Sequence, residues 1–227
     1  MNVKVVAGGV TQRAQFGVGD FELGKVGVGM EHEALIDGRW SGHMHFFQLW
    51  VNLPGEKKFD PPYFQRAASA RLPTVPMAAD GSATCKVLHG EVKGKASPTK
   101  CDDVAWQYLD FELKPNASVT HAPPAEWTTR LLHVYTGSVL VGADAAKAKR
   151  VDVGTVAFLD ASSGNDLIVT AGGEGAGFMF VAGRPIKQPI VQHGPFVMSS
   201  QQQIMKCFQD FQSGNLCPQP VTYELYD

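Results

Sequence analysis

Short apolar runs, separated by glycine, proline and polar turn residues, extend along almost the whole chain. In the second half the candidate strands are residues 84–88, 104–113, 128–135, 138–141, 155–159, 166–170 and 178–183. From Tyr108 to Leu113 polar and apolar side chains alternate, which is the period of two of a strand with one buried face. The pattern predicts an all-β protein.

The first half contains shorter candidates. Residues 3–6, 15–17 and 21–23 are predicted strands. Residues 27–52 are predicted to form a glycine turn, a strand, a polar turn and a second strand. Pro54 closes this second strand, because proline has no N–H for the ladder.

One helix is predicted near the end of the chain. Ser199 or Ser200 can cap its start, and Gly214 stands at the stop position. The residues between them carry one apolar stripe at helical spacing: Ile204, Cys207, Phe208 and Phe211. Residues 221–226 alternate again and are predicted as an edge strand.

Residues 55–80 differ in character, being rich in proline, small residues and polar residues. We therefore predict an N-terminal domain at 1–55, a linker at 56–80 and a C-terminal domain at 81–227.

Composition narrows the class of protein. Hydrophobic residues make up 44% and charged residues 19%, which is typical of a soluble globular chain. The net charge of −2, with no long basic run, argues against direct nucleic-acid binding. No apolar run reaches the length of a membrane span, and the first residues do not resemble a signal peptide. We expect no membrane association and a cytoplasmic location, also nuclear because the chain is small.

The candidate chemistry lies in residues 27–52. Potential metal ligands gather there: Glu31, His32, Glu33, Asp37, His43 and His45. His43 and His45, two residues apart, would lie on one face of a strand, as imidazole ligands do in β-barrel metal sites. His32, with an acidic neighbour, could complete a set of ligands for iron, manganese or another divalent metal. The alternative is that these histidines only form hydrogen bonds.

Other reactive residues form no comparable group. The four cysteines have no CxxC spacing, so they are expected to be reduced thiols. Cys85 and His89 are a weak candidate pair of nucleophile and base. His121, His133 and His193 are isolated in the sequence and are expected to be structural.

Several motifs resemble those of the pirin family. Residues 45–54, HFFQLWVNLP, and 61–65, PPYFQ, resemble the pirin signature HGLQLWVNLP followed by PPxYQ. The match continues through residues 108–111, YLDF, and 137–142, GSVLVG. It ends in residues 192–198, QHGPFVM, so the resemblance extends over about residues 19–213.

The resemblance implies a bicupin, that is, two β-barrels of which the N-terminal one holds non-haem iron. It places His32 at the third ligand position and His45 at the histidine of the HGLQLW motif, which lies downstream of the family's ligands. Glu33, His43 and His45 are further candidates from their spacing alone. Bacterial pirins resemble quercetin dioxygenases, and animal pirins are iron-bearing nuclear co-regulators of transcription factors. The resemblance therefore implies iron as cofactor and a flavonol-like phenol as small-molecule ligand.

Three departures from the family pattern change this expectation. Ala34 stands where the family has the Glu ligand, and Glu33, one residue away, would point to the opposite face of a strand. The residues before His32 contain no HPHRGFE-like segment, which carries two ligands in pirins. A closed barrel also needs on the order of 80–100 residues, and the predicted N-terminal domain has only residues 1–55. We therefore expect an incomplete N-terminal barrel and metal site, and a C-terminal barrel without metal, because His121-Ala122-Pro123 replaces the cupin HxH.

These expectations leave two functions open. One is a binding or regulatory protein with little or no catalysis, in which a protein partner or a second copy of the chain covers the open barrel. The other is a metal-dependent quercetin 2,3-dioxygenase-type oxygenase, if the missing ligands are supplied.

Overall fold

The computed structural model describes residues 14–15, 19–30, 34–35, 45–144, 146–164, 166–217 and 221–227. Strands dominate these residues, and the one α-helix among them is short. The predicted all-β class with a C-terminal helix is therefore confirmed. The chain forms two compact units, Met1–Ser69 with Ile186–Asp227, and Ala70–Pro185.

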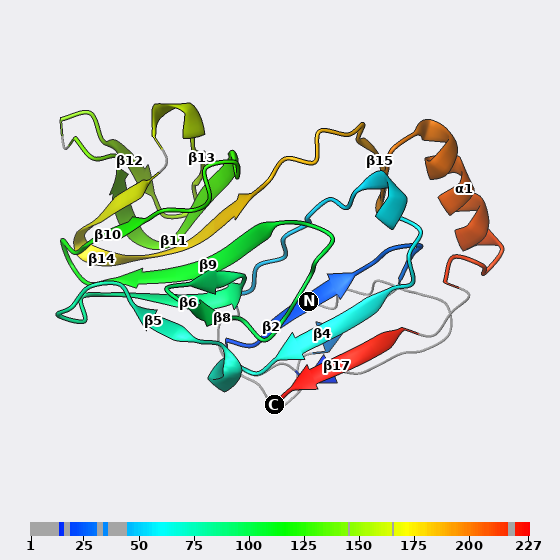
Figure 1. Cartoon of the computed structure of the whole chain (residues 1–227), viewed down its shortest axis with the longest axis horizontal. Coiled ribbons are helices and arrows are strands. Elements are labelled where there is room, and N and C mark those ends of the chain that lie inside the picture. Colours follow the sequence, from blue (N-terminus) through cyan, green and yellow to red (C-terminus); the bar gives the residue numbers. More distant parts are fainter. Residues whose placement is uncertain are drawn as a thin grey trace. The chain divides into compact units, whose positions relative to one another are not determined.

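The second unit is built on an eight-stranded sheet with the order β12-β11-β14-β9-β6-β5, where β10 pairs with β14 and β13 with β11. The long strand β14 lies between β9 and β11 and is antiparallel to both (Figure 1). The strands of this unit are β5 (Thr74–Pro76), β6 (Ala83–His89), β7 (Glu91–Val92), β8 (Lys95–Ala96), β9 (Trp106–Leu113), β10 (Ser118–His121), β11 (Thr129–Val141), β12 (Lys149–Asp152), β13 (Val156–Phe158) and β14 (Leu167–Gly183).

The core of this unit follows the predicted period of two. Leu109 and Phe111 of β9 are fully buried, and Phe178 and Phe180 of β14 pack with them. The rings of Phe111 and Phe178 stack at 5.0 Å between centroids. Each such side chain contributes about 1.5–3 kcal/mol by leaving water.

Two predicted interruptions are wrong. Residues 128–135 and 138–141 belong to one strand, β11, and residues 166–170 and 178–183 belong to β14. At the expected turn β11 instead has register shifts against β14, on either side of Thr136 and Gly137. A bulge uses the positive φ of glycine to bend a strand without reversing it.

The first unit contains a three-stranded sheet with the order β17-β4-β2, a β1-β3 pair and a β15-β16 hairpin. β17 runs parallel to β4, as Figure 1 shows, which confirms the predicted strand at 221–226. The elements are β1 (Ala14–Gln15), β2 (Phe21–Lys25), β3 (Ala34–Leu35), β4 (Tyr63–Ala67), β15 (Val191–His193), β16 (Phe196–Met198), α1 (Gln201–Gln212) and β17 (Thr222–Tyr226).

Two segments differ from the sequence prediction. The expected connector, residues 56–80, contains β4, β5 and 3-10 helices at Gly55–Lys57 and Ser69–Arg71; a third lies at Ala161–Ser163. Residues 45–54 form no strand, although exposure alternates from Phe46 to Trp50. The alternation suits a strand, but these residues have no ladder partner among the described strands. The predicted strand at 3–6 and the turn at Asp37-Gly38 lie outside the described residues.

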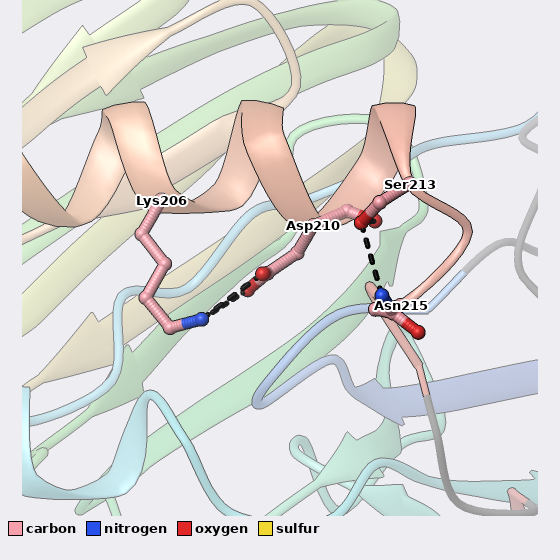
Figure 2. Close-up of polar contacts among 4 residues, drawn as sticks. All are labelled: Lys206, Asp210, Ser213 and Asn215. Carbon is pink, nitrogen blue, oxygen red and sulfur yellow. Dashed lines mark hydrogen bonds and ion pairs between the residues drawn. The ribbon is translucent and has the colours of Figure 1, made fainter.

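The predicted helix and its cap are confirmed. The Gln203 N–H donates to Ser200 Oγ at 3.3 Å, and Gly214 has a φ of +74°. Ile204 and Cys207 are buried, whereas Phe211 at the end of the stripe is 49% exposed. Figure 2 shows the outer face, where Lys206 pairs with Asp210 at 2.7 Å and Asn215 donates to Ser213 Oγ.

No helix in the described part of the chain is long and apolar enough to span a bilayer.

The bulge in β11 predicts a difference between two glycines of the second unit. Gly137 (φ +69°) and Gly154 (φ +79°) share a backbone conformation, but a Cβ at 137 would overlap the Gly175 carbonyl, whereas one at 154 would meet nothing. Gly137→Ala should lower the free energy of unfolding by about 2–4 kcal/mol. Gly154→Ala, the matched control, should cost only about 1 kcal/mol. Urea denaturation measures both, and equal losses would contradict the overlap at Gly137.

Candidate functional site

The predicted metal ligands fall mostly outside what the structure describes. His32, Glu33 and His43 all lie among the residues left undescribed. His45 is described, and its exposed ring lies 4.5 Å from the ring of Phe47, measured between centroids. Among the residues with described positions, no three His, Cys, Asp or Glu side chains gather around one point. The described residues alone do not make a metal site, so coordination at His32 stays a prediction.

The turn that leads to His32 is described and tightly held. The Val28 N–H donates to the Asp60 carbonyl, and the Gly29 N–H donates to the Val26 carbonyl, both at 3.0 Å. Gly27 has a φ of +52°, and a Cβ there would overlap the Asp60 carbonyl oxygen. The predicted glycine turn is therefore present, and only glycine fits at residue 27.

Asp60 also holds the strand before this turn. Its carboxylate accepts a hydrogen bond from the buried Lys25 ammonium at 2.7 Å. This bond, ahead of the other charges, lowers the pKa of Asp60. Through its carbonyl and its carboxylate, Asp60 fixes the end of β2 and the turn that follows.

A second buried lysine joins the pirin-like motifs. The Lys58 Nζ donates to Asn52 Oδ1, within the VNLP motif, and to the Val197 carbonyl at 3.0 Å, within QHGPFVM. Burial lowers the pKa of Lys58. Two motifs about 140 residues apart in sequence thus meet at one ammonium group.

A cluster that the sequence did not predict lies on the three-stranded sheet. Arg66 of β4 donates to Asp20 at 2.7 Å, and Glu22 of β2 is directly across from Arg66. Tyr223 of β17 hydrogen-bonds Glu22. Burial raises the pKa of Glu22 from its usual 4.5 to about 7, against the opposing effect of Arg66. Glu22 Oε1 is buried without a hydrogen-bond partner in the described structure.

The C-terminal barrel contains the second unpredicted group. His121, expected to be isolated, places its Nε2 2.8 Å from Gln107 Nε2. Burial, together with the smaller effect of the positive charge of Arg130, lowers the pKa of His121 to about 4. The imidazole is therefore neutral at pH 7. The inward register of Gln107, two residues before Leu109, is the sequence signal that could have found this pair.

Cys85 and His89 are not a nucleophile and base. Cys85 is fully buried in the barrel core, and burial raises the pKa of its thiol. His89 stacks on Trp106 at 4.4 Å, and its Nδ1 lies 3.3 Å from Thr99 Oγ1. Both residues are structural.

The buried Glu22 predicts a pH dependence of stability. In the folded protein the pKa of Glu22 is about 7, above its usual 4.5. The contribution of Glu22 to the free energy of unfolding is therefore fully present below pH 4.5 and is lost as the pH rises through 7. Glu22→Gln should match the wild type at pH 4.5 and exceed its free energy of unfolding by about 1–3 kcal/mol at pH 8. Urea denaturation across this range measures the difference. The exposed Glu91→Gln should show none, and a pH-independent difference for Glu22→Gln would refute the assignment.

Comparison with known proteins gives a consistent family. The profile of the pirin C-terminal cupin domain matches residues 108–217. The chain is 35% identical over 199 residues to a pirin-like protein of Caulobacter vibrioides, covering 87% of this chain and 68% of that protein. It is 31% identical over 169 residues to human pirin, covering 74% of this chain and 56% of pirin.

Similarity to solved structures agrees. A quercetin 2,3-dioxygenase from Acinetobacter baumannii aligns with a TM-score of 0.66 and 28% identity, covering 74% of this chain and 55% of that one. The chain thus spans between about half and two thirds of the length of these relatives. The described sheets, the shared motifs and the extent of the identity together show that this chain belongs to the pirin family of cupin proteins.

Proposed function

We propose that this chain is a binding protein of the pirin family, with little or no oxygenase activity of its own. The observation that carries the proposal is Ala34, the first residue of β3, which lies two positions after His32. At that position the pirin pattern has a carboxylate ligand, and a methyl group cannot bind a metal. Glu33 is displaced by one residue, and a displacement of one turns a strand side chain to the other face.

The expected cofactor is iron, held at His32. An oxygenase centre must keep several protein ligands on its metal while other positions stay open for substrate. The chain's own contribution would be to orient the His32 segment through the rigid turn at Gly27, which Asp60 fixes. Because Ala34 occupies one of the ligand positions and cannot bind a metal, we expect weak iron binding.

Binding rather than catalysis implies a macromolecular partner. We propose a protein or a second copy of the chain, and a role as co-regulator in the cytoplasm and nucleus. The large exposed apolar side chains of the motif segment, Phe46 at 58% and Trp50 at 57%, support a protein contact in this unit. If the partner is a second copy, light scattering of the purified chain should give a mass above that of one chain. If it is another protein, the mass should rise when that protein is added.

A second function is favoured by a specific observation. The similarity to a quercetin 2,3-dioxygenase extends over most of this chain, so an oxygenase that acts on a flavonol-like phenol is the alternative. It requires a full ligand set around the metal.

Restoring the missing carboxylate tests both functions. After anaerobic loading with Fe(II) and desalting, the wild type should retain well under one iron per chain and leave quercetin unchanged. Ala34→Glu should retain severalfold more iron, because it adds a hard oxygen ligand beside His32. His32→Ala should retain none. Metal analysis and quercetin absorbance measure the outcome.

The control is Ala70→Glu, which adds the same charge at an exposed position and should behave as the wild type. Stoichiometric iron in the wild type, with loss of quercetin that His32→Ala abolishes, would overturn the binding role and establish the oxygenase.

A further inference from the structure

The short strand β13 forms part of one edge of the sheet in the second unit (Figure 1). Among the described strands it pairs only with β11. Its side chains Val156 and Phe158 are 47% and 83% exposed, and Phe158 is the most exposed large apolar side chain in the described part of the chain. Such an aromatic ring would gain about 1.5–3 kcal/mol by leaving water, so its exposure on a strand edge needs a physical reason.

Two backbone hydrogen bonds fix which way β13 faces. The Thr155 carbonyl accepts a bond from β11 at 3.1 Å, and the Leu159 N–H donates to β11 at 3.0 Å. Backbone groups alternate between the two sides of a strand, so those of Val156 and Phe158 point away from β11. No other described strand pairs with β13 on that side. The edge therefore offers the N–H and C=O groups of both residues to a further strand.

Two other edge strands of this sheet are protected against such pairing. β12, which also lies along β11, carries the exposed charges of Lys149, Arg150 and Asp152. β5, at the opposite end of the sheet, ends in Pro76, which has no N–H to offer. Charges and proline are the usual means by which proteins block pairing at a sheet edge. Residues 153–159 contain neither.

The occupant that fits this edge is a second copy of the same strand. Two-fold symmetry would place the copy antiparallel to β13 with Ala157 on the axis, so that Val156 of each copy faces Phe158 of the other. The backbone groups of these two residues lie on the open side, so each facing pair can exchange both of its hydrogen bonds. Their apolar side chains lie on one face of the strand and would pack against each other. An isologous interface requires this self-complementarity.

The distribution of charge supports the same occupant. No charged residue lies between Asp152 and Asp160, so no like charges would meet close to the axis. With Ala157 on the axis, Asp160 would lie opposite Gly154 of the copy and not opposite another acid. This register therefore joins apolar side chains without opposing like charges, which would destabilise a strand pair.

We propose that the second unit self-associates through β13, so that the sheets of two copies join edge to edge. The interface is small because the paired strand has only three residues, so the dimer is weak and its population depends on the protein concentration. The association involves neither iron nor the His32 segment. It is also separate from the protein contact proposed for Phe46 and Trp50 of the first unit.

Sedimentation equilibrium of the full chain at pH 7 tests this association. Between about 1 and about 300 µM protein, a range suited to a small interface, the average mass should rise from that of one chain toward that of two. Phe158→Lys puts a charge into the apolar pair and should abolish the rise. Thr74→Lys, the matched control, adds the same charge at an exposed position of the edge strand β5 and should leave the rise unchanged. Trp50→Lys should also leave it unchanged, because Trp50 belongs to the first unit.

A second pair of variants isolates the backbone contribution. Val156→Pro removes an N–H that points away from β11, a change that an edge strand tolerates. Val156→Ala shortens the same side chain but keeps the N–H. The dissociation constant of the dimer should be at least tenfold higher for Val156→Pro than for Val156→Ala.

Cross-linking tests the register. In a non-hydrogen-bonded antiparallel pair the two Cα atoms are about 4.5 Å apart, within the range that a disulfide spans. Oxidised Ala157→Cys should therefore form a covalent dimer that reduction reverses, whereas Thr74→Cys should form none.

Three results would overturn the proposal. One is a constant mass of a single chain up to the highest concentration. Another is an association that Trp50→Lys abolishes and Phe158→Lys does not, which would place the contact in the first unit. The third is equal cross-linking of the two cysteine variants.

Discussion

The register between β14 and its neighbours is the constraint on which the second unit depends. β14 pairs with β9 on one side and with β11 on the other, and its start pairs with β10. Because side chains alternate, this single register places Phe178 and Phe180 in the core. A slip of one residue would expose both rings and bury the opposite face. The same register places Arg130 and Gln107 beside Ala182, so the positions of these buried polar residues follow from the apolar packing.

The first unit depends instead on contacts between segments far apart in sequence. Lys58 joins the segment after VNLP to the hairpin of residues 191–198, and the last strand lies along β4. The carboxylate of Asp20 accepts bonds from Arg66 and from the Ser69 N–H. These are polar contacts of defined geometry, whereas the second unit depends mainly on apolar burial.

The elements with a strong local signal could be predicted from the sequence. The alternation in β9 and the Ser200 cap of α1 depend only on neighbouring residues. The glycines of residues 27–29 also marked a turn, although the contact that requires glycine at residue 27 comes from the distant Asp60. The continuity of β11 could not be predicted, because a glycine that permits a turn also permits a bulge, and the Gly175 carbonyl on β14 decides between them. Glu22 and His121 acquire their unusual pKa values only through burial and through distant partners. The sequence motifs identified the family, but three of the four predicted ligands lie outside the described residues, so the metal site remains a prediction.

The parallel pairing of β17 with β4 has a consequence for how the protein is made. Residues 222–226 complete a sheet whose other strands end at residue 67, and everything from 70 to 185 belongs to the other unit. During synthesis the second unit can fold as soon as its last strand leaves the ribosome, since domains fold as units. The sheet of the first unit must wait until residues 222–226 have been made. Strands β2 and β4 therefore stay without β17 while the whole second unit is synthesised, and the free edge of β4 is open to chaperones during that time.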